Sequence, residues 1–138
     1  MRYELEPEVA GGLGTNTVAD SSFHPPLVEK LHYEFSGWLG DDLLESFPCY
    51  IVTTALASKI QNTNLTGIVL ETVEISKSEV FLQLYPSIIL PSFKWLKIIG
   101  SEKEDFTINE NGILSISNKA FSVLKQTSLN NCDINQVT

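Results

Sequence analysis

Short apolar runs, separated by turn-forming residues, constrain the fold of this 138-residue chain more than any other feature. Purely aliphatic runs such as Ile68-Val69-Leu70 and Ile88-Ile89-Leu90 are three residues long. A membrane-spanning helix needs roughly 18 or more apolar residues in succession. Apolar residues make up 43% of the chain, enough to fill a hydrophobic core. The sequence therefore predicts a globular domain.

Several segments have the pattern of β-strands. Residues 29–35 alternate between polar and apolar, as a half-buried strand does. Leu31, Tyr33 and Phe35 are expected on the buried face, and His32 on the polar face. Asn111-Gly112 can supply the positive φ angles of a hairpin turn. The other expected strands are residues 48–52, 68–75, 94–99, the hairpin pair 106–108 and 113–116, and an edge strand at 132–137.

Three short helices are expected between these strands. Thr53 or Thr54 can cap a helix that runs through Ile60. The sequence Ser76-Lys77-Ser78-Glu79 has the spacing of a capping box, which predicts a helix of about two turns ending at Pro86. Ser117 is expected to cap a third helix, with Ala120, Phe121, Leu124 and Leu129 facing inward.

Strands that occur both in a hairpin and between short helices predict an α+β fold. We expect a mixed, mostly antiparallel sheet with the short helices packed on one side. The chain length predicts a single domain over residues 1–138, with a loop-rich N-terminal segment at 1–27 and an α+β core at 28–138. Residues 10–26 contain three glycines and two prolines and are expected to form a long connection.

Charge is distributed unevenly along the chain. The formal net charge is −8, and residues 1–50 carry nine acids against Arg2 and Lys30, or −7. Such a field repels nucleic acid and anionic lipid and attracts a basic macromolecule. The alternative interpretation is that the acidity serves solubility alone.

The start of the chain, Met1 to Glu6, is acidic where a signal peptide would be basic. Cys49 and Cys132 lie 83 positions apart without metal-ligand spacing around either. We therefore expect a cytoplasmic protein with reduced cysteines, no zinc site and no membrane or nucleic-acid partner.

No familiar catalytic motif occurs in the sequence. Neither G-x-S-x-G nor H-E-x-x-H is present, and His24 and His32 are the only histidines. Gly11-Gly12-x-Gly14 is interpreted as a flexible turn, because no Lys-Ser/Thr follows it and the preceding glutamates would repel phosphate. The chain is therefore expected to have no catalytic residues and no cofactor.

Asp41, Asp42 and Glu45 form the densest acidic group. They could bind a divalent cation, act as solvated surface or contact a partner protein. Trp38-Leu39 directly before them favours partner contact, because charge-rimmed aromatic anchors are typical of interfaces. The predicted partner-binding residues are Phe23, Tyr33, Glu34, Trp38, Leu39, Asp41, Asp42 and Glu45.

Five segments of the chain resemble the small bacterial immunity proteins encoded beside polymorphic and contact-dependent toxins. They are EVAGGLGTNTV (8–18), HPPLVEKLHYEFSGWLGDDLLESFP (24–48), SEVFLQLYP (78–86), LPSFKWLKIIG (90–100) and ILSISNKAFSVL (113–124). Such proteins often close with a strand, a serine-capped helix and a short tail, the order in the last segment.

The resemblance implies an antidote that binds a cognate toxin domain and blocks it, with no catalytic residues of its own. The charge favours a basic toxin. Two alternatives remain: a small enzyme that uses Asp41, Asp42, Glu45 and His32, or a regulatory module that binds other proteins.

Overall fold

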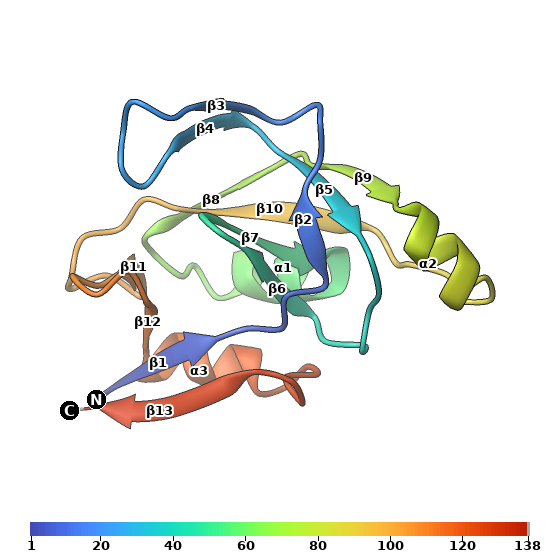
Figure 1. Cartoon of the computed structure of the whole chain (residues 1–138). Coiled ribbons are helices and arrows are strands. Elements are labelled where there is room, and N and C mark those ends of the chain that lie inside the picture. Colours follow the sequence, from blue (N-terminus) through green and yellow to red (C-terminus); the bar gives the residue numbers. More distant parts are fainter. Residues whose placement is uncertain (138) are drawn as a thin grey trace.

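The computed structural model describes residues 1–137, and its central layer is a four-stranded antiparallel sheet (Figure 1). The strand order is β6 (Leu43–Ser46), β7 (Cys49–Thr53), β10 (Phe93–Ile98) and β8 (Ile68–Glu71). Every residue of β7 is buried. Tyr50 and Val52 face one hydrophobic core, and Cys49 and Ile51 face a second. The central sheet is therefore covered on both faces, which explains why β7 is apolar throughout rather than alternating.

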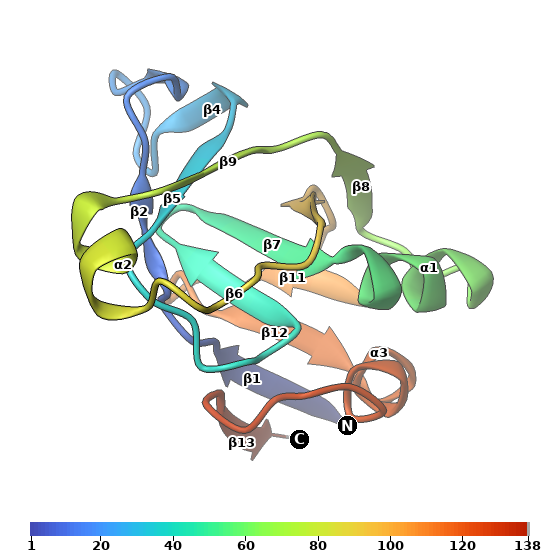
Figure 2. The ribbon, with the colours of Figure 1, turned by 90° about the vertical axis from the view of Figure 1, so that its right-hand side faces the viewer.

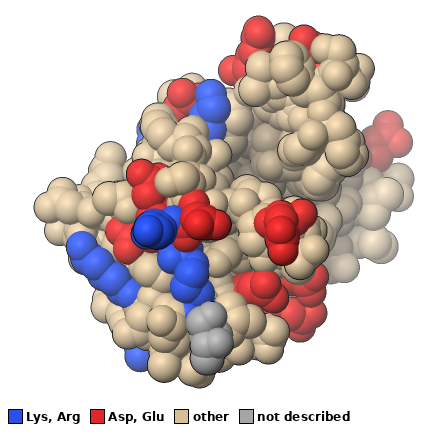
Figure 3. Space-filling view, turned by 90° about the vertical axis from the view of Figure 1, so that its left-hand side faces the viewer, with Lys and Arg blue, Asp and Glu red and all other residues tan. Residues whose placement is uncertain are grey.

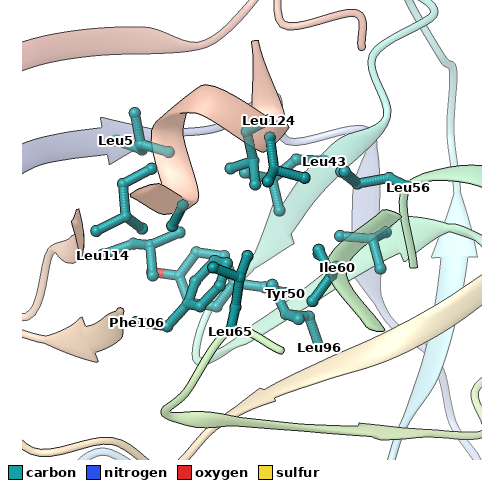
Figure 4. Close-up of a cluster of buried hydrophobic side chains, with 14 of the residues drawn as sticks. Leu5, Leu43, Tyr50, Leu56, Ile60, Leu65, Leu96, Phe106, Leu114 and Leu124 are labelled. Atoms are coloured by element: carbon teal, nitrogen blue, oxygen red, sulfur yellow. The ribbon is translucent and has the colours of Figure 1, made fainter. Parts of the chain in front are cut away.

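The first core lies between the central sheet and a second antiparallel sheet (Figure 4). This sheet has the order β11 (Phe106–Ile108), β12 (Leu114–Ser117), β1 (Arg2–Glu6) and β13 (Asp133–Val137). Helices α1 (Thr54–Asn62) and α3 (Asn118–Leu124) complete the core. The first and last strands meet here, because β1 pairs with β13 along its whole length.

The second core lies on the opposite face of the central sheet (Figure 2). It is covered by the sheet β2 (Gly11–Leu13), β5 (His32–Phe35) and β9 (Glu74–Lys77), in which β5 and β9 are parallel. Helix α2 (Glu79–Leu84) contributes the buried ring of Phe81. The hairpin of β3 (Val18–Asp20) and β4 (Leu27–Lys30) extends from this layer.

The α+β class is confirmed: the chain is a single small domain of mostly antiparallel sheets with three short helices among residues 1–137. Two details of the prediction are wrong. The described strands form four sheets rather than one, and the helices are not all on one side, since α1 and α3 pack in the first core and α2 in the second. The segment 1–27, expected to be loop-rich, contains β1, β2 and β3.

The residues that cap the three helices can be compared with the caps predicted from the sequence. Thr53 and Ser117 cap α1 and α3 as expected, and each side chain accepts a hydrogen bond from an amide in the first turn. The predicted cap at Ser76 is wrong, because the cap of α2 is Ser78, whose hydroxyl accepts from the Phe81 amide. Ser76 lies in β9 instead.

Of two strand predictions, one is wrong and one is confirmed. The expected strand 68–75 is two strands, β8 and β9, that belong to different sheets. The hairpin of β11 and β12 forms as expected, and Gly112 in its turn has a φ of +76°.

Candidate functional site

Asp41 lies inside the protein and Asp42 is half-buried, and both hold the loop that follows α3. Asp41 is 0% exposed, and its carboxyl oxygens accept hydrogen bonds from the backbone N–H groups of Asn130 and Asn131 at 3.1 and 2.8 Å. The Asn131 side chain donates a third hydrogen bond to Asp41. Asp42 accepts from the Ser128 N–H at 2.9 Å and from the Thr53 hydroxyl. These two carboxyl groups are internal acceptors, so a partner cannot reach Asp41 in this structure.

Trp38 and Leu39 have different surroundings. The Trp38 ring is half-buried, its Nε1–H donates to the Asp41 carbonyl at 3.0 Å, and it meets the Phe93 ring edge-on. Leu39 is 72% exposed. Trp38 therefore contributes to the second core, and Leu39 is the part of this segment that solvent reaches.

Tyr33 is fully buried and belongs to the same internal framework. Its hydroxyl donates to the Glu45 carbonyl at 2.9 Å and accepts from the Ala10 N–H at 3.0 Å. Burial raises the pKa of Tyr33 to about 12. Burial also raises the pKa of the half-buried Glu45 carboxyl, and the nearby negative charge of Glu6 acts in the same direction.

Phe23 and Glu34, the other predicted contact residues, are exposed on the surface. The eight predicted residues therefore do not form one surface.

The glycine-rich segment packs closely against β5. A Cβ atom at Gly14 would lie 2.2 Å from Nδ1 of His32, and one at Gly11 would lie 1.9 Å from the Glu34 carbonyl oxygen. His32 is 5% exposed, not on a solvated face as expected. Its Nδ1 accepts from the Asn16 N–H, and its Nε2 lies 2.7 Å from the Ser76 hydroxyl. Glycine is therefore required at positions 11 and 14 for this close packing.

The side chains of the enzymatic alternative are not brought together by hydrogen bonds. His32 contacts Asn16 and Ser76, whereas Asp41 and Asp42 hold the loop after α3. Across residues 1–137, no group of three or more His, Cys, Asp or Glu side chains has an arrangement that could hold a metal ion.

An acidic strip, defined as Glu4, Glu6 and Asp133, lies on the outer face of β1 and β13. Glu6 is directly opposite Asp133 in the antiparallel register. Like charges in opposed positions destabilise a strand pair. The strip lines a shallow hollow of about 170 Å³ together with Ile113, Ile134 and Asn135, so its described lining contains no cation.

Few of the carboxylates are neutralised by ion pairs. Within residues 1–137, Lys30 with Glu74 at 3.5 Å is the only pair between a lysine or arginine and a carboxylate. Figure 3 shows the consequence on one face of the molecule: its right half carries acidic side chains without basic ones, and the basic side chains gather on the left half. The right half of this face therefore has an uncompensated negative field.

A groove lies between three turns. It has a volume of about 450 Å³ and is lined by His24-Pro25 from the β3–β4 turn, Phe47-Pro48 from the β6–β7 turn, residues 109–112 from the β11–β12 turn, and Tyr50 and Ile108. We call it the three-turn groove. A smaller hollow of about 180 Å³ shares Pro25, Pro48, Tyr50 and Ile108 with it and continues to Leu27.

The sequence prediction missed this groove. The signal available in the sequence was the presence of prolines in two of the three turns, but the turns are far apart along the chain.

A scan of protein-family models found no match to this chain, and a search of curated proteins also found none. No helix within residues 1–137 is long and apolar enough to cross a membrane.

Proposed function

We propose that this protein is an antidote that binds a basic toxin domain and blocks it by occlusion. The observation that carries the proposal is the uncompensated negative field, with a single lysine–carboxylate ion pair among the described residues against a net charge of −8. Unneutralised carboxylates attract a cationic partner over long range and raise its association rate. The resemblance of five segments to bacterial immunity proteins supports the same function.

The proposed place of action is the cytoplasm. Cys49 and Cys132 are both free in the structure and would stay reduced there. The proposed partner is a protein rather than nucleic acid, because the negative field would repel a phosphate backbone.

Protection of cells tests the function. Cells that express the toxin encoded beside this protein's gene should survive when the wild-type protein is co-expressed and should die without it. Failure of the wild-type protein to protect, together with failure of the purified proteins to associate, would reject the proposal.

Association kinetics test the role of charge. Changing the acidic strip with Glu4→Gln, Glu6→Gln and Asp133→Asn takes the net charge from −8 to −5. The association rate should fall about 3- to 10-fold at low salt, and the difference should shrink as added salt screens the field.

The matched control removes three carboxylates from other elements: Glu34 on β5, Glu71 on β8 and Glu79 at the start of α2. It also reaches a net charge of −5. Because Glu34 is one of the predicted contact residues, this control tests that prediction too. A larger loss of rate in the control than in the acidic-strip variant would contradict the role given to β1 and β13.

A further inference from the structure

The three-turn groove presents apolar side chains to solvent in a concave arrangement. Phe47 is 57% exposed and Ile108 38%, and Leu27 in the adjoining smaller hollow is 50% exposed. Burying an aromatic or aliphatic side chain of this size is worth about 1.5–3 kcal/mol. A concave apolar surface of this kind suits the insertion of one apolar side chain from a partner, in the manner of an interface anchor.

The walls of the groove are already ordered. The Asn109 side chain accepts hydrogen bonds from the amides of Asn111 and Ile113 at 2.9 and 3.0 Å. Its Nδ2 donates to the Glu4 carboxylate at 2.9 Å. Tyr50 is only 4% exposed and is fixed in the first core. A preformed groove loses little conformational entropy when a partner binds, which favours affinity.

The charges around the groove decide which partner fits. Glu110 is exposed and lines the groove directly, and Glu4 is joined to it through Asn109. Burial raises the pKa of the Tyr50 hydroxyl, and the negative charges of Glu45 and Glu6 act in the same direction. Among the described residues that line the three-turn groove, none is a lysine or arginine. Lys97 lines the smaller hollow, where its ammonium group lies over the Trp95 ring at 5.2 Å from the ring centroid.

We propose that the three-turn groove receives an apolar side chain of the toxin that is flanked by lysine or arginine residues. The inference rests on the proposed function and specifies its contact site and the chemistry of the partner segment. The apolar side chain fills the space between Phe47, Ile108 and the prolines, and the flanking cations meet Glu110 and the acidic strip.

A second apolar surface gives the control. The outer side of α2 and the segment after it expose Val80, Leu82, Leu84, Tyr85 and Ile89. Leu84 is 64% exposed, close to the value for Phe47. Phe47→Asp and Leu84→Asp therefore place the same new charge on two exposed apolar patches.

The experiment measures the affinity of each purified variant for the purified toxin domain encoded by the adjacent gene. Phe47→Asp should raise Kd by about 10-fold or more, mainly through faster dissociation, and Leu84→Asp should change it less than about 3-fold. Thermal unfolding of both variants shows whether each is folded.

A charge variant keeps the test valid if Phe47→Asp does not fold. Glu110→Lys lies on an exposed turn and should weaken binding about 10-fold, with less effect at high salt. Glu71→Lys makes the same charge change on β8 and should have a smaller effect.

Hydrogen exchange in the complex supplies the direct readout. The amides of residues 47, 49, 50 and 108–113 should be protected by the toxin. Two outcomes would overturn the proposed contact site while leaving the antidote function intact. In the first, Glu110→Lys binds the toxin with the same affinity as the wild-type protein. In the second, the toxin protects residues 79–89 instead of the groove. Absence of wild-type binding and protection would reject the function itself.

Discussion

Asp41→Asn perturbs the most deeply buried acid of the chain while leaving the shape of the side chain unchanged. In the wild-type protein the two carboxyl oxygens of Asp41 accept three hydrogen bonds, two from Asn131 and one from the Asn130 amide. An asparagine can keep its oxygen in the place of Oδ1, which accepts two of them. Its NH₂ group then faces the Asn131 N–H, which lies 2.8 Å from Oδ2 in the wild-type protein. One hydrogen bond is lost, and two donors face each other.

The size of the effect follows from these contacts. Hydrogen bonds to a charged acceptor contribute about 1.5–3 kcal/mol each, and neutral ones about 0.5–1.5 kcal/mol. The variant loses one bond outright and weakens two. Removing the charge also relieves its repulsion of the Glu8 carboxyl, which offsets part of the loss. We expect the free energy of unfolding to fall by about 2–3 kcal/mol.

Urea unfolding at pH 7, followed by far-UV circular dichroism, measures this change. Asp41→Ala removes both acceptor oxygens and all three hydrogen bonds, and should cost more, about 3–5 kcal/mol. Glu102→Gln is the control, because this carboxylate is exposed and should change stability by less than about 0.5 kcal/mol. An Asp41→Asn protein within about 0.5 kcal/mol of wild type would refute the internal role of this carboxyl group.

Three further predictions concern local features. Ser78→Ala should lower the free energy of unfolding by about 1 kcal/mol and speed amide exchange in the first turn of α2. Ser76→Ala should leave that exchange unchanged, because the Ser76 hydroxyl contacts the buried imidazole of His32 and does not cap the helix. Urea unfolding measures the stability of each variant, and hydrogen exchange measures the effect on the helix. Gly14→Ala should cost about 1–3 kcal/mol, while Gly12→Ala, whose new Cβ would meet nothing within 4 Å, should change stability by about 0.5 kcal/mol or less in the same urea assay. Burial raises the pKa of the Glu8 carboxyl, so the folded state binds the carboxyl proton more tightly than the unfolded state does. Protonated Glu8 therefore stabilises the fold at low pH, and this contribution is lost as pH rises through the folded-state pKa. Glu8→Gln should therefore gain stability relative to wild type between pH 4.5 and pH 7, and a constant difference across unfolding curves in that range would contradict the assignment.

Features that depend on a few neighbouring residues could be predicted from the sequence. The caps at Thr53 and Ser117 and the turn at Gly112 each need only a short local pattern. Tyr33 and Phe35 were placed on the buried face by alternation alone, and both are 0% exposed.

Features that depend on tertiary contacts could not be predicted in this way. Ser76 and Ser78 are equivalent as local caps, but the parallel pairing of β9 with β5 extends to Lys77, so the helix cannot begin before Ser78. His32 occupies a polar position in its strand, yet Gly14 packs directly against its ring and buries it.

The positions of the acids at 41–45 also depend on tertiary contacts. Asp41, Asp42 and Glu45 are indistinguishable from surface charge in the sequence. The amides that Asp41 and Asp42 bind belong to residues 128–131, more than 80 positions away along the chain.

The distribution of charge in the fold changes which variants can test partner binding. Asp41, Asp42 and Glu8 are used inside the protein, so part of the −7 counted over residues 1–50 is not presented to a partner. Asp133, from the other end of the chain, joins Glu4 and Glu6 because β13 pairs with β1. Reversing Asp41 and Asp42 to lysine would place cations against the amides of the loop after α3, and protection of cells would be lost through unfolding even if the interface were elsewhere. Neutralising Glu4, Glu6 and Asp133 removes opposed like charges instead, so the protein should stay folded, and a lower association rate would then report the field that the partner meets.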